Sequence, residues 1–389
     1  MGLSIKLPVA PGVSDTFVLS APRNFPARQT QTFNRVAYAA AHVVADPWST
    51  KEPWLDAAID WDQTIAFRRH LWSLGFGVAE AMDTAQRGMG LDWPTSLALI
   101  KRSVAAARDF PGAVLASGAG TDHLALSDPC TIDQVIAAYE EQCAAVEGAG
   151  SRIILMASRG LAACAKSPDD YAKVYGRILA QVREPVIIHW LGETFDPALE
   201  GYWGNRNHHE AMKTAIAIIN ENAAKIDGVK VSLLDKEKEI VMRRQLHPGI
   251  RMYTGDDFNY AELIEGDDQG YSDALLGIFD VIAPAASAAL SALAAGDRIR
   301  YHEILAPTVP LSRHIFRAPT RFYKTGVVFL AWLNGHQDHF VMVGGQQGAR
   351  NILHLAEAFR LADRAGLLRD PVLACSRMRQ LLATHGVPT

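Results

Sequence analysis

Eight short apolar segments, separated by longer stretches of mixed polarity, constrain the fold of this 389-residue chain most. Apolar runs of this length, bounded by Gly, Pro or polar residues, are typical of buried strands, and the intervals between them are long enough for helices. Eight strand–helix units predict a (β/α)8 TIM barrel. The expected strands lie within residues 35–45, 76–81, 112–118, 152–158, 185–192, 228–234, 250–255 and 270–277.

A doubly wound open sheet is the alternative fold. It usually carries a G-x-G-x-x-G turn after its first strand or a phosphate-binding P-loop. The chain has neither motif at those places. The intervals also show helix signals, since residues 60–75 and 131–150 carry helical apolar spacing and end in Gly, and residues 167–182 open with Ser-Pro-Asp-Asp.

The rest of the chain divides around this expected barrel, which spans residues 35–294. Residues 1–34 are rich in Pro, Ser, Thr and Gln and predict an irregular N-terminal arm. Residues 295–389 are almost wholly helical in pattern, which is more helix than an eighth barrel unit needs. We therefore predict an appended C-terminal helical subdomain.

Composition restricts the partners that such a chain could bind. Apolar residues make up 49% and charged residues 21%, and the net charge is -4, so neither nucleic acid nor a membrane surface is an expected partner. No run of about 18 apolar residues is present. The four cysteines are scattered without a C-x-x-C pair, which is typical of reduced thiols. We expect a cytoplasmic protein that binds a small molecule.

The sixth expected strand, G-V-K-V-S-L-L, places a lysine among apolar residues. Alternate residues of a strand share a face, so Lys230, Ser232 and Leu234 point one way. The apolar residues Val229, Val231 and Leu233 point the other way. The apolar set suits the surrounding helices, so Lys230 is expected to enter the lumen. An amine in a partly desolvated site loses pKa and becomes nucleophilic, which allows a Schiff base with a carbonyl substrate. A structural ion pair with a carboxylate is the alternative role.

These residues resemble the dihydrodipicolinate synthase / N-acetylneuraminate lyase superfamily. That family carries a G-[IV]-K strand, an acidic residue five places later, and a strand that reads S-G-D-D. Here Gly228, Val229, Lys230 and Asp235 match, and the later strand reads T-G-D-D at residues 254–257. The resemblance covers roughly residues 35–370, and its other carriers are residues 58–77, 114–124, 185–192, 270 and 319–335.

The resemblance implies a barrel with extra C-terminal helices that assembles as a homodimer or homotetramer. It implies a class I aldolase, lyase or dehydratase acting on 2-oxo acids or related carbonyl compounds. The family lysine forms an imine with the substrate, so Lys230 is the expected catalytic nucleophile. The imine acts as an electron sink for the charge left by bond cleavage. No cofactor is then expected, apart from a possible divalent metal.

Two positions depart from the family pattern. The family's second strand ends in a G-T-T-G-E loop that binds the substrate carboxylate, whereas residues 79–88 offer Glu80, Asp83 and Thr84. Carboxylates would repel the carboxylate of an oxo acid. The family's catalytic tyrosine on the fifth strand falls at His189, which could relay protons in its place or could be a core histidine bonded to backbone.

Further polar residues follow or lie in the expected strands, and active sites of such barrels form at the strands' carboxyl ends. Arg159 is the residue expected to receive a substrate carboxylate or phosphate. Acidic side chains with hydroxyls suit polyols, whose hydroxyl groups donate to carboxylates. We predict substrate contacts for Glu80, Asp83, Thr84, Asp122, Arg159, Ser232, Asp256 and Ser272.

Three functions remain open from the sequence. The first is a Schiff-base aldolase, lyase or dehydratase that uses Lys230 as nucleophile and His189 as proton shuttle. The second is a metal-dependent sugar isomerase, epimerase or lyase whose ligands would be Glu80, Asp83, Asp122 and His189. The third is a non-catalytic binding protein derived from an enzyme, which a blocked lumen or a lysine of ordinary pKa would favour.

Overall fold

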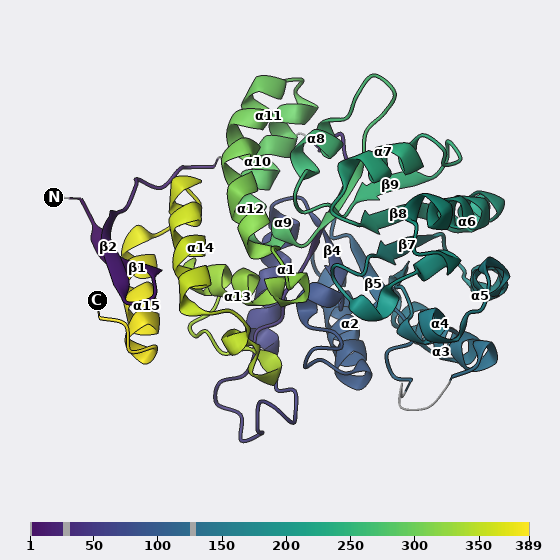
Figure 1. Cartoon of the computed structure of the whole chain (residues 1–389), viewed down its shortest axis with the longest axis horizontal. Coiled ribbons are helices and arrows are strands. Elements are labelled where there is room, and N and C mark those ends of the chain that lie inside the picture. The colour runs from purple at the N-terminus through teal and green to yellow at the C-terminus, as the bar shows by residue number, and fades with distance from the viewer. Residues whose placement is uncertain (1, 26–31, 125–129, 389) are drawn as a thin grey trace.

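Eight parallel strands close into a barrel in the computed structural model, which describes residues 2–25, 32–124 and 130–388. Figure 1 shows the strands at the centre of the larger part of the molecule. The predicted TIM barrel is confirmed, and every expected strand overlaps one observed strand. In hydrogen-bonded order these are β10 (Asp273–Leu276), β3 (Ala37–Ala40), β4 (Gly77–Glu80), β5 (Leu115–Ala119), β6 (Arg152–Leu155), β7 (Val186–Leu191), β8 (Ile226–Ser232) and β9 (Arg251–Thr254).

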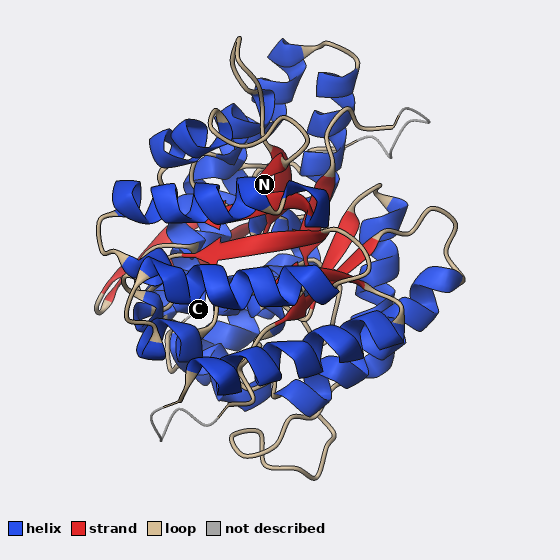
Figure 2. Cartoon of the chain, turned by 90° about the vertical axis from the view of Figure 1, so that its right-hand side faces the viewer, coloured by secondary structure: helices blue, strands red, loops and turns tan. Residues whose placement is uncertain are grey.

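Helices cover the outside of the barrel (Figure 2). Their ends follow the local sequence signals, since Asp60 caps the first helix and Thr131 forms a capping box with Gln134. The helices along the barrel are α1 (Trp61–Ser73), α2 (Trp93–Arg108), α3 (Ile132–Ala149), α4 (Arg159–Cys164), α5 (Pro168–Gln181), α6 (His208–Glu221), α7 (Lys236–Arg243), α8 (Tyr260–Glu265), α9 (Ile278–Val281) and α10 (Ala283–Ala294).

The C-terminal helices form a further layer on one side of the barrel, where the two chain ends also meet (Figure 1). They are α11 (Arg298–Leu305), α12 (Val309–Ile315), α13 (Tyr323–Leu333), α14 (Ile352–Arg364) and α15 (Pro371–Thr384). The N-terminal segment differs from the irregular arm expected for residues 1–34. It contains an antiparallel hairpin of β1 (Ser4–Ala10) and β2 (Val13–Val18), because Ile5 and Leu7 alternate along β1 and pack against α14 and α15.

The lumen is filled by side chains below its mouth. A compact cluster of inward-facing residues seals it, namely Tyr38, Ala40, Ala79, Met82, Ala116, Ile154, Ile187, Tyr253 and Leu275. Gly228 leaves room for the Tyr253 ring, which a Cβ at that position would approach to 2.5 Å. No helix in the described residues is both long and apolar enough to span a membrane.

Candidate active site

Lys230 projects into the barrel lumen from β8, as the alternation of its strand predicts. Its neighbours in register are His189 on β7 and Tyr253 on β9. The side chain is 8% exposed and lines a narrow cavity above the lumen cluster, with room for about one water molecule. The walls of this cavity, here called the lysine cavity, also include Ala40, Met82, Asp83, Thr84, Leu191, Phe195, Ser232, Asp257, Gly277 and Tyr323.

The amine of Lys230 lies near two carboxylates but forms no hydrogen bond with a described residue. Burial lowers its pKa below the ordinary value, and the carboxylates of Asp257 and Asp83 partly offset that effect. Within the described part of the chain, no residue forms a hydrogen bond or ion pair with the amine. An amine with a lowered pKa and a free lone pair is the form that attacks a carbonyl carbon.

Asp257, not Asp256, is the carboxylate that faces Lys230. Asp256 accepts hydrogen bonds from the backbone N–H groups of Phe258 and Asn259 and from the Asn259 side chain. The oxygens of Asp256 thus hold the turn after β9, and the geometry lends no support to its predicted substrate contact. Asp257 accepts an N–H from Ile278 at 2.9 Å, and burial raises the pKa of its carboxyl to about 7.

His189 lies beside Lys230 and is fully buried. Its Nε2 is 3.2 Å from the hydroxyl of Ser232, and its Nδ1 has no hydrogen-bond partner among the described residues. Burial, followed by the charge of Lys230, holds the pKa of His189 well below its usual range. The imidazole is therefore neutral at neutral pH and can relay a proton only through Ser232 or a bound molecule.

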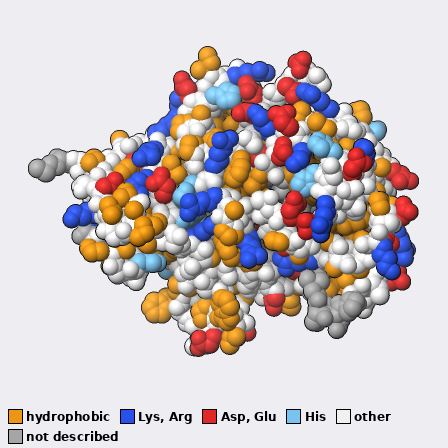
Figure 3. Space-filling model, viewed as in Figure 1, with side chains coloured by type: hydrophobic (Ala, Val, Ile, Leu, Met, Phe, Trp, Pro, Cys, Tyr) orange, Lys and Arg blue, Asp and Glu red, His pale blue; other side chains and the backbone are white. Residues whose placement is uncertain are grey.

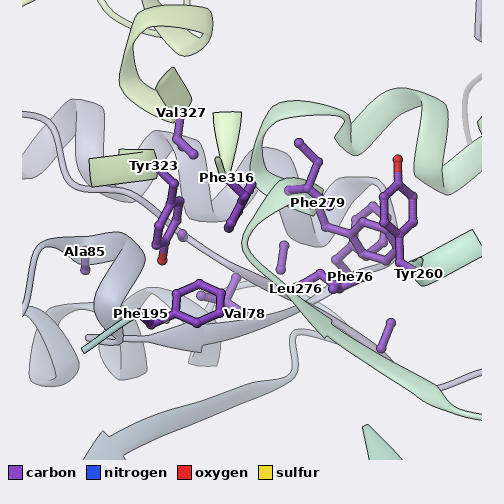
Figure 4. Packing of buried hydrophobic residues seen from close by; sticks show 14 of the residues in the cluster. Phe76, Val78, Ala85, Phe195, Tyr260, Leu276, Phe279, Phe316, Tyr323 and Val327 are labelled. Atoms are coloured by element: carbon purple, nitrogen blue, oxygen red, sulfur yellow. The ribbon is translucent and has the colours of Figure 1, made fainter. Parts of the chain in front are cut away.

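The loop after β4 closes the mouth with a short 3-10 turn, Asp83–Ala85. Thr84 bonds to the hydroxyl of Tyr323, 2.7 Å away, which comes from the start of α13. Figure 4 shows the Tyr323 hydroxyl pointing away from its helix between Ala85 and Phe195. Burial raises the pKa of Tyr323 well above its ordinary value, so this hydroxyl keeps its proton. The sequence analysis missed Tyr323, although it included α13 in the family resemblance.

Two further residues that were predicted to contact substrate lie away from the lysine cavity. Glu80 points out of the barrel, because Ala79 takes the inward position on β4, and its carboxylate is held by Arg68 at 2.8 and 2.9 Å and by Ser103 at 2.5 Å. Ser272 precedes β10 and so lies at the opposite end of the barrel. Its hydroxyl donates to Glu239 at 2.7 Å.

The lysine cavity opens into two wider clefts at the carboxyl ends of the strands. Asp83 and Leu191 line all three spaces. The smaller cleft, of about 70 Å³, is lined by Asp122, Arg159 and His189, and the larger, of about 320 Å³, is lined by Arg159, Arg321 and Lys324. The lysine cavity thus brings Asp83, Thr84 and Ser232 together with Lys230, and His189 is the neighbour of Lys230 in register. Arg159 and Asp122 line the wider clefts instead.

Asp122 is already paired within the protein. Arg87 donates to both of its oxygens at 2.6 and 3.1 Å, and Gln142 donates to it at 3.1 Å. Burial alone would raise the pKa of Asp122, but the charge and hydrogen bonds of Arg87 outweigh burial and lower it.

The four residues named above as metal ligands do not form a ligand set. Glu80 is bonded to Arg68 outside the lumen, and Asp122 is bonded to Arg87. In the ranges that the structure describes, no three His, Cys, Asp or Glu side chains are grouped so as to hold a metal ion.

Comparison with solved structures identifies the class of fold. A dihydrodipicolinate synthase from Oceanobacillus iheyensis is similar over 90% of this chain and 97% of its own, with a TM-score of 0.57 and 14% identity. The prophage protein YagE of E. coli K12 belongs to the dihydrodipicolinic acid synthase family and was solved with pyruvate. It is similar over 91% of this chain and 99% of its own, with a TM-score of 0.63 and 12% identity. The enzyme from Acinetobacter baumannii, also with pyruvate, covers 86% and 99% with a TM-score of 0.63 and 14% identity.

The resemblance to this superfamily is therefore confirmed at the level of the fold. The chain itself belongs to the family described as "Protein of unknown function (DUF993)", whose model matches residues 5–387. A search of curated proteins gives no match.

Proposed function

We propose that this protein is a Schiff-base lyase or aldolase that acts on a small carbonyl compound, with Lys230 as its nucleophile. The observation that carries the proposal is the placement of the Lys230 amine, which lies in the lumen cavity, has a lowered pKa and is bonded to none of the described residues. The neighbouring structures share the fold, and two of them hold pyruvate. A homodimer or homotetramer, as the superfamily resemblance implies, is part of the proposal.

The first step joins the amine to the carbonyl carbon. The lone pair of Nζ attacks that carbon, one proton passes from the nitrogen to the carbonyl oxygen, and the resulting hydroxyl takes up a second proton and leaves as water, so that an iminium remains. Asp257, with a pKa of about 7, can supply one proton near neutral pH. The hydroxyl of Tyr323, bonded to Thr84, is a second donor on the cavity wall.

The iminium then accepts the electrons of the bond that breaks. A base removes the proton of a hydroxyl group on the β-carbon, counted from the iminium carbon. The bond between the α-carbon and the β-carbon then breaks. Its electron pair forms an enamine with the iminium, and protonation and hydrolysis release the product and restore Lys230. The side chain of Asp83 faces the cavity and forms no hydrogen bond with any described residue, so it suits the role of base.

The other two functions gain no support from the geometry. The residues considered as metal ligands are dispersed, as described above. A binding protein without catalysis was expected to have a blocked lumen or a lysine of ordinary pKa, and the lowered pKa of Lys230 is unlike the second of these features.

Reductive trapping tests the proposal. The protein is incubated with sodium cyanoborohydride and a panel of 2-oxo acids, aldehydes and ketoses, and its intact mass is measured. We expect at least one carbonyl compound to give an adduct at Lys230, located by peptide mass analysis, that forms faster than adducts on exposed lysines. Lys230→Met should show only the slower labelling of exposed lysines, with circular dichroism confirming that the variant folds. Equal trapping in the wild type and Lys230→Met would contradict the proposal.

A further inference from the structure

The larger cleft beside the lysine cavity is lined by an excess of cationic side chains. Its charged residues are two carboxylates, Asp83 and Asp196, and four cations, Arg87, Arg159, Arg321 and Lys324. Acidic and basic groups alternate over the face seen in Figure 3, so this excess is a local feature of the cleft. We call this space the cationic cleft.

Two of the four cations have carboxylate partners, but one of them keeps free donors. Arg87 is fully committed, because it bonds to Asp122, to Gln142 and to the backbone oxygen of Gly118. Arg159 donates only its Nε, to Asp196 at 2.5 Å, and its side chain is 43% exposed. The two terminal nitrogens of Arg159 therefore remain available to a bound anion.

Lys324 is the cation of this cleft that is buried without an ion-pair partner among the described residues. It is 4% exposed and lies in the first turn of α13. Its amine donates to the backbone oxygen of Arg321 at 3.0 Å and contacts the sulfur of Met89 at 3.5 Å, but no carboxylate in the described ranges pairs with it. Burying an unpaired ammonium is costly, and burial lowers the pKa of Lys324 to about 8, so it stays mostly protonated at neutral pH.

The lysine cavity has the opposite character. Apart from Lys230, its charged wall residues are the carboxylates Asp83 and Asp257, and no arginine lines it. A carboxylate attached directly to the reacting carbonyl carbon would face these two acids. Substrate hydroxyl groups would instead donate to Asp83, which lines both spaces and so stands between the reacting carbon and the cationic cleft.

We propose that the substrate is a hydroxylated aldehyde or ketone that carries a phosphate or carboxylate remote from its reacting carbonyl, and that Lys324, Arg159 and Arg321 bind this anion. This inference rests on the proposed Schiff-base function and narrows its substrate class. It also explains how the chain can lack the carboxylate-binding loop after β4, since the anion-binding residues lie on α4, on α13 and in the turn before α13 instead.

The test compares pairs of carbonyl compounds that differ only in a remote anion. Glyceraldehyde is set against glyceraldehyde 3-phosphate, ribose against ribose 5-phosphate, and glucose against glucuronate, with pyruvate as the compound whose carboxylate adjoins the carbonyl. The rate of cyanoborohydride trapping at Lys230 is measured at concentrations well below saturation. We expect the remote anion to raise the rate about tenfold or more, as charge-assisted hydrogen bonds allow, and pyruvate to show no such advantage. The pair with the largest ratio identifies phosphate or carboxylate as the bound group.

Two variants locate the effect. Lys324→Met and Arg321→Gln should each lower the ratio of anionic to neutral trapping, and Arg321 is exposed, so its replacement does not endanger folding. Lys173→Met is the matched control, because Lys173 pairs with Asp133 on the outer helices and should leave the ratio unchanged. Calorimetry with inorganic phosphate gives a second readout that needs no imine, and binding should weaken in Lys324→Met.

The possible outcomes separate the two proposals. Trapping of neutral aldehydes at Lys230 without any gain from a remote anion would overturn the substrate class and leave the Schiff-base function standing. A gain that persists in both Lys324→Met and Arg321→Gln would also overturn it. Absence of trapping by every compound would overturn the function itself, and with it this inference.

Discussion

At the scale of single residues, the chemistry depends on how Lys230 and Asp257 share one cavity. Burial disfavours charge on both groups, so it lowers the pKa of the amine and raises that of the carboxyl to about 7. Each group favours the charged form of the other. A fraction of Asp257 therefore stays protonated near neutral pH, which leaves a proton donor beside a readily deprotonated amine.

Replacing Asp257 with Asn should change the pH dependence of imine formation. The Asp257 carboxylate raises the pKa of Lys230, so its removal should move the midpoint of the trapping rate to lower pH. Loss of the proton donor should also slow trapping at pH 7, by about a hundredfold for a general acid. Asp256→Asn is the matched control, because Asp256 serves the turn after β9, and it should keep the wild-type midpoint. Identical profiles for all three proteins would rule out Asp257 as a partner of the amine.

The alternation of a strand predicts which residues face the lumen, but it stops where the strand stops. Lys230 and Ser232 could be placed from the sequence because they lie within β8. Asp256 and Asp257 follow the end of β9, where the turn sets the direction of each side chain, so the sequence could not distinguish them. Glu80 is informative in another way, because the inward position of Ala79 on β4 already required Glu80 to point outward.

At the scale of elements, the position of Lys230 depends on the close approach of β9 to β8. A Cβ on Gly255 would lie 2.3 Å from the Ser232 hydroxyl, 2.6 Å from the backbone oxygen of Val231 and 2.8 Å from Cε of Lys230. Only a residue without a side chain leaves room for these groups. The glycine of the T-G-D-D motif is thus explained by packing around the lysine.

Gly255→Ala should therefore damage both stability and chemistry. The added methyl group must displace backbone or Lys230, which should cost about 1–3 kcal/mol in the free energy of unfolding and slow trapping at Lys230. Gly176→Ala is the control, because Gly176 lies inside α5 with open space around it and should stabilise the helix by up to about 1 kcal/mol. Urea unfolding and trapping rates check both. A Gly255→Ala protein with wild-type trapping would refute this account of the packing.

The contribution of α13 was beyond sequence reasoning for a physical reason. Thr84 and Tyr323 are 239 residues apart, and their contact depends on how the C-terminal helices pack over the barrel mouth. No local periodicity encodes such an approach. The family resemblance did include α13. The roles of Tyr323 and Lys324 could be inferred only from the structure, in which Tyr323 lines the lysine cavity and Lys324 lines the cationic cleft.

At the scale of the whole molecule, the barrel was predictable because its strands and helices repeat eight times. The N-terminal hairpin was not, although Ile5 and Leu7 carried the alternation of a strand. The hairpin joins the two ends of the chain, since Arg360 of α14 donates to the backbone oxygens of Leu7 and Pro8.

The stability of the whole molecule should depend on pH through Glu239. Burial raises the pKa of its carboxyl to about 8 in the folded protein, against 4.5 as its ordinary value. The unfolded chain therefore releases this proton first, and the contribution of Glu239 to stability falls as pH rises from about 4.5 to about 8. Glu239→Gln should lose less stability than the wild type over this range, as urea unfolding at pH 5 and pH 9 would show. Parallel pH profiles would contradict a protonated Glu239.

The most direct test of the account is the pH dependence of labelling at Lys230 itself. Peptide-resolved mass analysis after trapping with glycolaldehyde would follow Lys230 and the exposed Lys173 in the same sample. We predict that Lys230 is labelled faster than Lys173 at pH 7.5. The pH midpoint of its labelling rate should lie below 10.5, the ordinary pKa of a lysine. Labelling of Lys230 that is slower than that of Lys173, or that occurs only after unfolding, would contradict the central claim.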